Sequence, residues 1–210
     1  IHRTAYGYDD IGNLTKVQTD GAAPEISVYG EDGRPHALTS NALGSYGYDE
    51  RGRQTDAPGR TATFTERDLP RTVTTAAGET RFAYDAAGRR VRKVGPDGSA
   101  VLTLGGLYER RESGAGVQHV FYVHGVEGPV AQVVVDQGAG TSSTEYLHTD
   151  PLGSVGAVTT ESGALLQQRY YEPFGGRRDK DGGLLAAVPA SDVQIGFAGL
   201  THDDELGLVD

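Results

Sequence analysis

A short tyrosine-led unit recurs along the chain and limits its possible folds more than any other feature. The fullest copies read Tyr-Asp-x-x-Gly-Arg, and aromatic-led units begin at intervals of 14 to 25 residues. About twenty residues hold two strands of ~5–8 residues and two turns. Hairpins of this size bury apolar surface only against their neighbours, so the sequence predicts a stacked repeat architecture. The units start at Tyr8, Tyr29, Tyr48, Phe64, Tyr84, Tyr108, Tyr122, Tyr146 and Tyr171.

Each position of the unit has a physical role. The tyrosine is expected to end a strand, with its ring packed on the next repeat and its hydroxyl in water. The aspartate accepts backbone N–H bonds in the following turn, and the glycine adopts a positive φ. We therefore predict structural roles for Tyr8, Asp9, Gly12, Tyr48, Asp49, Gly52, Tyr84, Asp85, Gly88, Asp150, Gly153, Tyr171, Pro173 and Gly175.

Composition agrees with an all-β chain of antiparallel hairpins. The 31 glycines and 9 prolines, against 37% apolar residues, suit short strands and tight turns. No segment keeps a helical period, and no run reaches the ~18 apolar residues of a membrane span. The absence of cysteine excludes disulfides and cysteine-ligated zinc, but does not reveal the compartment.

Charge is distributed unevenly. Residues 1–120 carry 15 Lys and Arg against 16 Asp and Glu, whereas residues 121–210 carry 4 against 13. The acidic second part argues against nucleic-acid binding, which requires a basic surface. Solvated loops explain this acidity better than a basic partner does.

The stretch Tyr146–Gly176 is the best-formed part of the series and the first place to look for chemistry. Asp150 could act as an acid near a cleavage centre. An aspartate before a proline is, however, ordinary in a turn, so a turn-forming role is favoured.

Other candidate sites are incomplete. His119 and His124 are five residues apart, which on one strand places them on opposite faces. Asp179-Lys180-Asp181-Gly182 is similar to the start of a calcium loop but lacks its later ligands. Asp203-Asp204-Glu205 is interpreted as a solvated turn, and Asn13-Leu14-Thr15 is a glycosylation sequon. We predict no catalytic, metal or cofactor site and no enzyme activity.

The order of motifs resembles the C-terminal RHS repeat-associated core of the Rhs/YD-repeat family. The match covers the last 65 residues closely, and the upstream repeats extend it over nearly the whole chain. The family usually has His in place of Pro151 and Asp in place of Glu172. The motifs are residues 146–155 (YLHTDPLGSV), 171–175 (YEPFG), 197–199 (FAG) and 202–208 (HDDELGL).

The resemblance implies a structural role. In this family the repeats form a spiralling sheet that builds a hollow shell around a C-terminal polypeptide, often a toxin. It implies YD repeats over residues 1–125 and a core domain over 126–210, truncated before the family's terminal cleavage motif. The chain starts with Ile1 and is expected to be an internal or processed piece.

Two alternative functions therefore remain. The first is a shell segment of an exported, secreted or cell-surface bacterial protein. Its partners would be the remaining repeats, the enclosed toxin and components of a secretion system or toxin complex, with no nucleic acid and no membrane span. The alternative is a cell-surface adhesion or carbohydrate-binding module, which requires an exposed aromatic stripe. An isolated autoprotease is disfavoured, because the terminal motif is missing.

Overall fold

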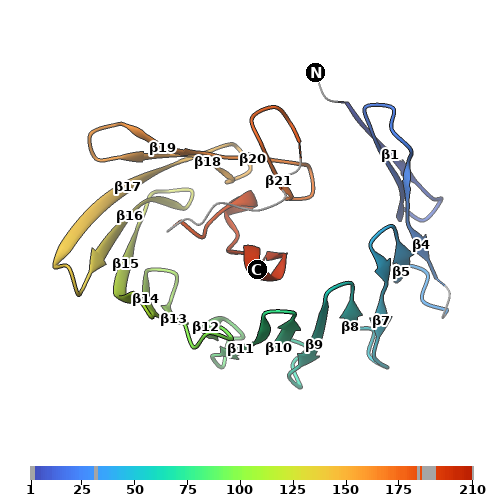
Figure 1. Cartoon of the computed structure of the whole chain (residues 1–210), viewed down its shortest axis with the longest axis horizontal. Helices are drawn as coiled ribbons and strands as arrows, with labels where there is room; N and C mark the ends of the chain where they lie inside the picture. The colour runs from blue at the N-terminus through green and yellow to red at the C-terminus, as the bar shows by residue number, and fades with distance from the viewer. Residues whose placement is uncertain (1–2, 31–32, 184, 186–192, 210) are drawn as a thin grey trace. The chain divides into compact units, whose positions relative to one another are not determined.

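The computed structural model describes residues 3–30, 33–183, 185 and 193–209. The chain divides into two compact units, Ile1–Thr80 and Arg81–Asp210, which are described separately. Figure 1 labels many of the strands of both units along the ribbon.

The first unit is a succession of short antiparallel strands. Two three-stranded sheets have the orders β1-β2-β3 and β4-β5-β6, and strands β7 to β10 then follow in chain order. Their bounds are Thr4–Tyr8 (β1), Leu14–Thr19 (β2), Glu25–Ile26 (β3), Val28–Tyr29 (β4), Leu38–Asn41 (β5), Gly44–Ser45 (β6), Gly47–Tyr48 (β7), Gln54–Ala57 (β8), Arg60–Phe64 (β9) and Pro70–Thr75 (β10).

The second unit contains the longer strands, again paired antiparallel in chain order from β11 to β19. In Figure 1 this ribbon curves, and the red C-terminal segment lies on its concave side. The strands are Gly78–Tyr84 (β11), Arg90–Val94 (β12), Ala100–Leu104 (β13), Tyr108–Ser113 (β14), Gly116–His124 (β15), Pro129–Asp136 (β16), Thr141–Thr149 (β17), Val155–Thr160 (β18) and Leu165–Gln168 (β19).

The end of the second unit is made of very short elements. Two small antiparallel pairs, β20-β21 and β22-β23, accompany two 3₁₀ turns. The elements are Tyr170–Tyr171 (β20), Arg177–Arg178 (β21), Phe197–Gly199 (η1), His202–Asp203 (β22), Asp204–Leu206 (η2) and Leu208–Val209 (β23). The predicted all-β fold of antiparallel hairpins is confirmed.

One five-residue loop closes hairpin after hairpin. In the copy at Asp85, the Asp85 N–H donates to Arg89 O at 2.9 Å, and the Gly88 N–H donates to Asp85 O at 3.0 Å. The Asp85 carboxylate accepts the N–H groups of Ala87 (2.8 Å) and Arg89 (2.9 Å). Gly88 has φ 82°, which glycine adopts at no steric cost. The same backbone and carboxylate bonds are made at Asp9, Asp49, Asp150 and Asp179.

The loop also forms where its sequence signature is absent. At Thr65, a hydroxyl replaces the carboxylate and accepts the N–H groups of Arg67 (3.3 Å) and Leu69 (3.2 Å). Asp68, with φ 62°, stands at the glycine position of that loop. Thr160 and Glu172 begin further copies, judged by their backbone bonds. Glu172 and Pro151, the two departures from the family pattern, are therefore compatible with the loop.

Several half-buried tyrosine hydroxyls bond to the protein backbone, whereas the sequence predicted hydroxyls in water. Tyr29 donates to Leu14 O (3.1 Å), Tyr48 to Leu38 O (3.0 Å) and Tyr171 to Val155 O (3.0 Å). Each bond reaches back 10 to 16 residues along the chain. A buried hydroxyl needs a partner, and these tyrosines find it in an earlier backbone carbonyl.

The apolar core of the second unit lies on one face of the curved strands. Val120, Tyr122 and Val134 form one buried cluster, and Leu147, Val155, Val158 and Val193 form another. Ile195 packs against both clusters. Burying side chains of this kind stabilises a fold by about 1.5–3 kcal/mol each. The covered face is therefore the one against which residues 193–195 pack.

Candidate functional site: the anchored C-terminal segment

The most elaborate arrangement of side chains surrounds residues 193–209, here called the C-terminal segment. Val193, 2% exposed, packs against Leu147, Val155 and Val158. The Val155 N–H donates to Gly196 O at 3.0 Å, which continues the contact along the backbone. The segment is thus joined to strands β17 and β18 by apolar packing and by main-chain bonding.

Arg169 clamps the start of the segment. Its guanidinium donates to Val193 O (2.8 Å) and Ile195 O (2.9 Å). Gln167 Oε1 accepts two further bonds at 2.7 and 3.0 Å, which fix the plane of the group. Burial, and then the nearby Arg177, lower the pKa of Arg169 from its ordinary value. The five fixed donors of arginine suit this bridging role, which lysine could not reproduce.

The loop of Asp150 supports the next part of the segment. Its carboxylate accepts the Ser154 N–H at 2.9 Å. Ser154 is 1% exposed, and its Oγ accepts the Ala198 N–H at 3.1 Å. A Cβ on Gly153 would lie 3.7 Å from the backbone of Ala198. Asp150 therefore holds a turn, as the sequence favoured, and that turn supports η1.

The loop after Tyr171 contacts the same region from the other side. The Tyr171 ring lies 5.9 Å from the rings of both Phe197 and His202. A Cβ on Gly175, which has φ 90°, would lie 3.1 Å from Phe197. The structure therefore places Tyr171 and Gly175 against Phe197, and Gly153 of the Asp150 loop against Ala198 and Gly199 of the same turn η1.

His202 is buried, with 6% of its surface exposed. Its Nε2 accepts the Phe197 N–H at 2.9 Å, and its Nδ1 faces Asp204 Oδ1 at 3.5 Å. Burial, and then Arg177, lower the pKa of His202 below its ordinary 6.5, although Asp204 acts in the opposite direction. The imidazole is therefore neutral near pH 7 and serves as a structural acceptor.

Asp203 ties the end of the segment to a distant strand. The residue is 1% exposed and accepts Arg90 Nη1 and Lys93 Nζ, both at 2.5 Å. Lys93 also pairs with Glu205. The sequence predicted a solvated turn at Asp203-Asp204-Glu205, but Asp203 is a buried ion-pair partner. Removing one member of such a pair leaves a buried charge uncompensated, which is costly.

A second polar cluster lies among the core residues of β14 to β17. Arg111 donates to Glu109 Oε2 (2.7 and 2.9 Å) and to the Tyr122 hydroxyl (3.1 Å). Burial raises the pKa of Tyr122, so the hydroxyl stays protonated. Gln132, 0% exposed, donates to Glu145 Oε2 at 2.8 Å, and its Oε1 has no partner among the described residues.

The remaining predicted residues lie elsewhere. Tyr8, Asp9 and Gly12, like Tyr48, Asp49 and Gly52, belong to the loops of the first unit. Tyr84, Asp85 and Gly88 form the loop between β11 and β12, and Pro173 lies exposed between β20 and β21. These residues shape hairpins.

The other candidate sites take part in local structure. Asp179 caps the common loop, and in the described part of the chain no three His, Asp or Glu residues form a metal-binding group. His119 bonds to Tyr108 and Gln137, whereas His124 is exposed at the end of β15. Asn13 is 7% exposed and bonded to Asp9, Pro35 and His36, which leaves its sequon inaccessible.

Sequence reasoning missed the residues that make the anchor: Arg169, Ser154, Arg90 and Lys93. Ser154 bonds to a residue 44 positions away along the chain, and Lys93 to one 110 positions away. The sequence contains the charges themselves, Arg90, Lys93 and the acidic run 203–205, but no signal that pairs them.

Comparison with known proteins agrees with this architecture. The teneurin YD-shell family model matches residues 2–210. The chain belongs to this family. The match extends over both units and includes the anchored C-terminal segment, as the predicted kinship with YD-repeat proteins requires.

Individual relatives of this YD-shell chain are much longer. It is 29% identical over 157 residues to the double-stranded DNA deaminase toxin A of Burkholderia cenocepacia (strain H111), covering 62% of this chain and 11% of that protein. Two crystal structures, TcdB2-TccC3-TEV and TcdB2-TccC3, superpose with TM-scores of 0.78 at 19% and 20% identity. They cover 100% and 99% of this chain, which spans 11% of each matched chain. The fold is therefore shared with part of a larger assembly.

Proposed function

We propose that this chain is a structural segment of a hollow YD shell that encloses a C-terminal polypeptide, a toxin in the favoured case. Membership of the YD-shell family supports the shell, and similarity to a deaminase toxin supports a toxic cargo. In this proposal residues 1–125 are YD repeats and 126–210 are the core domain. The parent protein is exported, and the remaining repeats and toxin-complex components are its partners.

The observation that carries the proposal is the anchoring of the C-terminal segment on the covered face of the strands. Apolar packing at Val193, the Arg169 clamp and the Asp203 ion pairs hold it there. A chain fixed in this way is directed along the face that a closed shell would turn inward. Among the described residues no helix is long and apolar enough to cross a membrane.

Limited proteolysis of the full-length gene product tests enclosure. We expect the polypeptide after the core to resist protease in the native protein and to be cut once the protein is denatured. Arg169→Ala should expose it, because the clamp on Val193 and Ile195 is lost. Arg92→Ala is the matched control, since Arg92 is an exposed arginine on β12. Free digestion of the polypeptide in the native wild-type protein would refute the proposal.

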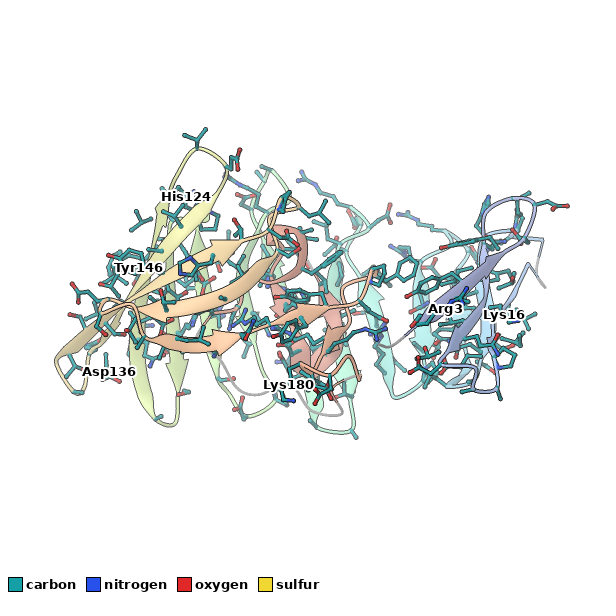
Figure 2. The ribbon with its side chains drawn as sticks, turned by 90° about the horizontal axis from the view of Figure 1, so that it is seen from above. Arg3, Lys16, His124, Asp136, Tyr146 and Lys180 are labelled. Carbon is teal, nitrogen blue, oxygen red and sulfur yellow. The ribbon has the colours of Figure 1, made fainter. Side chains whose placement is uncertain are left out.

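A second candidate, an adhesion or carbohydrate-binding surface, is favoured by one observation. Val123, Ala131 and Tyr146 are direct cross-strand partners and share the face opposite the core. Phe121, Val123 and Tyr146 are 45%, 48% and 43% exposed. Figure 2 shows the side chains of this region, with Tyr146 and His124 labelled. Exposed aromatic and apolar groups of this kind can bind a partner.

Substitution separates the two candidates. Tyr146→Ala and Phe121→Ala should leave the fold intact, because both side chains are substantially exposed. Loss of glycan or cell binding by these variants, with unchanged melting, would support adhesion. Unchanged binding would leave enclosure as the function.

A further inference from the structure

The hydrogen bonding of His202 requires a neutral imidazole. Nε2 accepts the Phe197 N–H at 2.9 Å, so the ring carries its single proton on Nδ1, which faces Asp204. A Cβ on Gly196 would lie 2.5 Å from His202 Cδ2. The ring is therefore packed directly on the backbone of the turn that it supports.

Charged groups surround the imidazole on every packed element. Arg177 of β21 and Arg169, which follows β19, act against a positive charge on His202. Asp204 of η2 acts in favour of one, but this carboxylate already accepts Arg177 Nε (3.2 Å) and Nη2 (3.0 Å). Tyr171 of β20 places its ring beside the imidazole. Asp203, which lies on β22 with His202, pairs with Arg90 and Lys93.

A second proton on the ring would have to bind at Nε2. The Phe197 N–H would then lose its acceptor and face a new N–H donor. The imidazolium would also lie beside two guanidinium groups in a mostly buried site. Both effects act on the turn of residues 196–203, where β22 and η1 meet the Asp150 loop. The anchor at Val193 and Ile195 contains no group that titrates in the same range.

We propose that protonation of His202 releases the turn of residues 196–203, so that mild acid loosens the distal part of the C-terminal segment while its start stays clamped. This regulation rests on the proposed function, because a loosened segment would alter how the following polypeptide is held. The pKa of His202 is lower in the folded chain than its ordinary 6.5. Its contribution to stability is therefore present above pH 6.5 and is lost as the pH falls below 6.5 through the folded-state pKa.

Hydrogen exchange measured by mass spectrometry on the full-length protein tests this directly. Between about pH 7.5 and 5, after correction for intrinsic exchange, peptides covering residues 196–203 should lose roughly tenfold protection. Peptides covering the buried Val73 of β10 should not change, because residues 37–118 contain no histidine. The polypeptide after the core is assayed for protease resistance in the same samples.

His202→Gln is the decisive variant. Glutamine can present an acceptor to the Phe197 N–H but does not protonate in this range, so the acid response should disappear. His148→Gln is the matched control, because His148 is an exposed histidine bonded to Thr159, and its variant should keep the response. NMR titration of His202 in the wild-type chain gives a second measurement if the variant fails to fold.

Two results would overturn the proposal. One is equal protection of residues 196–203 at both pH values in the wild type. The other is a His202 ring that titrates at or above 6.5 by NMR. Protease sensitivity of the cargo at both pH values would instead refute enclosure, and the exchange data would still decide the role of His202.

Discussion

Arg90 and Asp203, 113 residues apart in sequence, meet through an Nη1–Oδ2 contact of 2.5 Å. The Asp203 side chain is 2% exposed and Arg90 is 14% exposed, so the pair is largely removed from water. Lys93 completes the arrangement by donating to the second carboxylate oxygen. This buried carboxylate attaches the later part of the C-terminal segment to β12.

Asp203→Ala should destabilise the second unit by about 3–5 kcal/mol, because Arg90 and Lys93 would be left without their buried partner. Chemical denaturation of the wild type and the variant measures the difference. Asp181→Ala, which removes an exposed carboxylate paired with Lys180, should change stability by less than about 1 kcal/mol. Equal effects of the two substitutions would show that Asp203 does not anchor the segment.

Gly175→Ala should cost more than Gly163→Ala. Both glycines have positive φ, 90° and 83°, so each substitution incurs roughly 1–2 kcal/mol of backbone strain. A Cβ on Gly175 also meets Phe197 at 3.1 Å, whereas nothing lies within 4 Å at Gly163. The larger fall in melting temperature expected for Gly175→Ala therefore reflects the contact of the added methyl group with Phe197. A larger loss at Gly163 would contradict this assignment.

Asp68→Gly should stabilise the first unit by up to about 1 kcal/mol, since Asp68 holds φ 62° in a loop position that glycine occupies elsewhere. The variant loses the ion pairs of Asp68 with Arg51 and Arg53. Asp68 is largely exposed, so these pairs contribute little. Thermal unfolding checks the sign, and a lower melting temperature would mean that the ion pairs outweigh the backbone term.

Acid should weaken the hairpin loops. The Arg89 backbone N–H donates to the Asp85 carboxylate, and so does the Arg89 side chain. These two bonds, the backbone bond first, lower the pKa of Asp85 below its ordinary 3.8. The loop's contribution is therefore complete above pH 3.8 and is lost as the pH falls through the lower folded-state pKa. Carboxyl NMR titration measures this pKa directly. A value at or above 3.8 would exclude the loop bonds from acid lability.

Local features of the fold could be predicted from the sequence, but the anchor could not. Asp85 and Gly88 form their bonds within five residues, so the repeat sequence alone is enough to predict this loop. Thr65 forms the same loop with a hydroxyl, which a search for the Tyr-Asp signature cannot detect. Arg169 bonds to carbonyls 24 and 26 residues away, and Asp203 to side chains 110 and 113 residues away. Neither local propensity nor periodicity carries that information.

The C-terminal segment also sets a geometric limit on the second unit. Its start is fixed to β18 by Val193, and Asp203 fixes its far end to β12, six strands away. Six strand spacings amount to about 29 Å along the sheet, and ten extended residues reach at most ~35 Å. The segment is therefore long enough to link β12 to β18 directly, although these strands are not neighbours in the sheet. Its two attachments cross-link strands that pairing in chain order alone would leave unconnected.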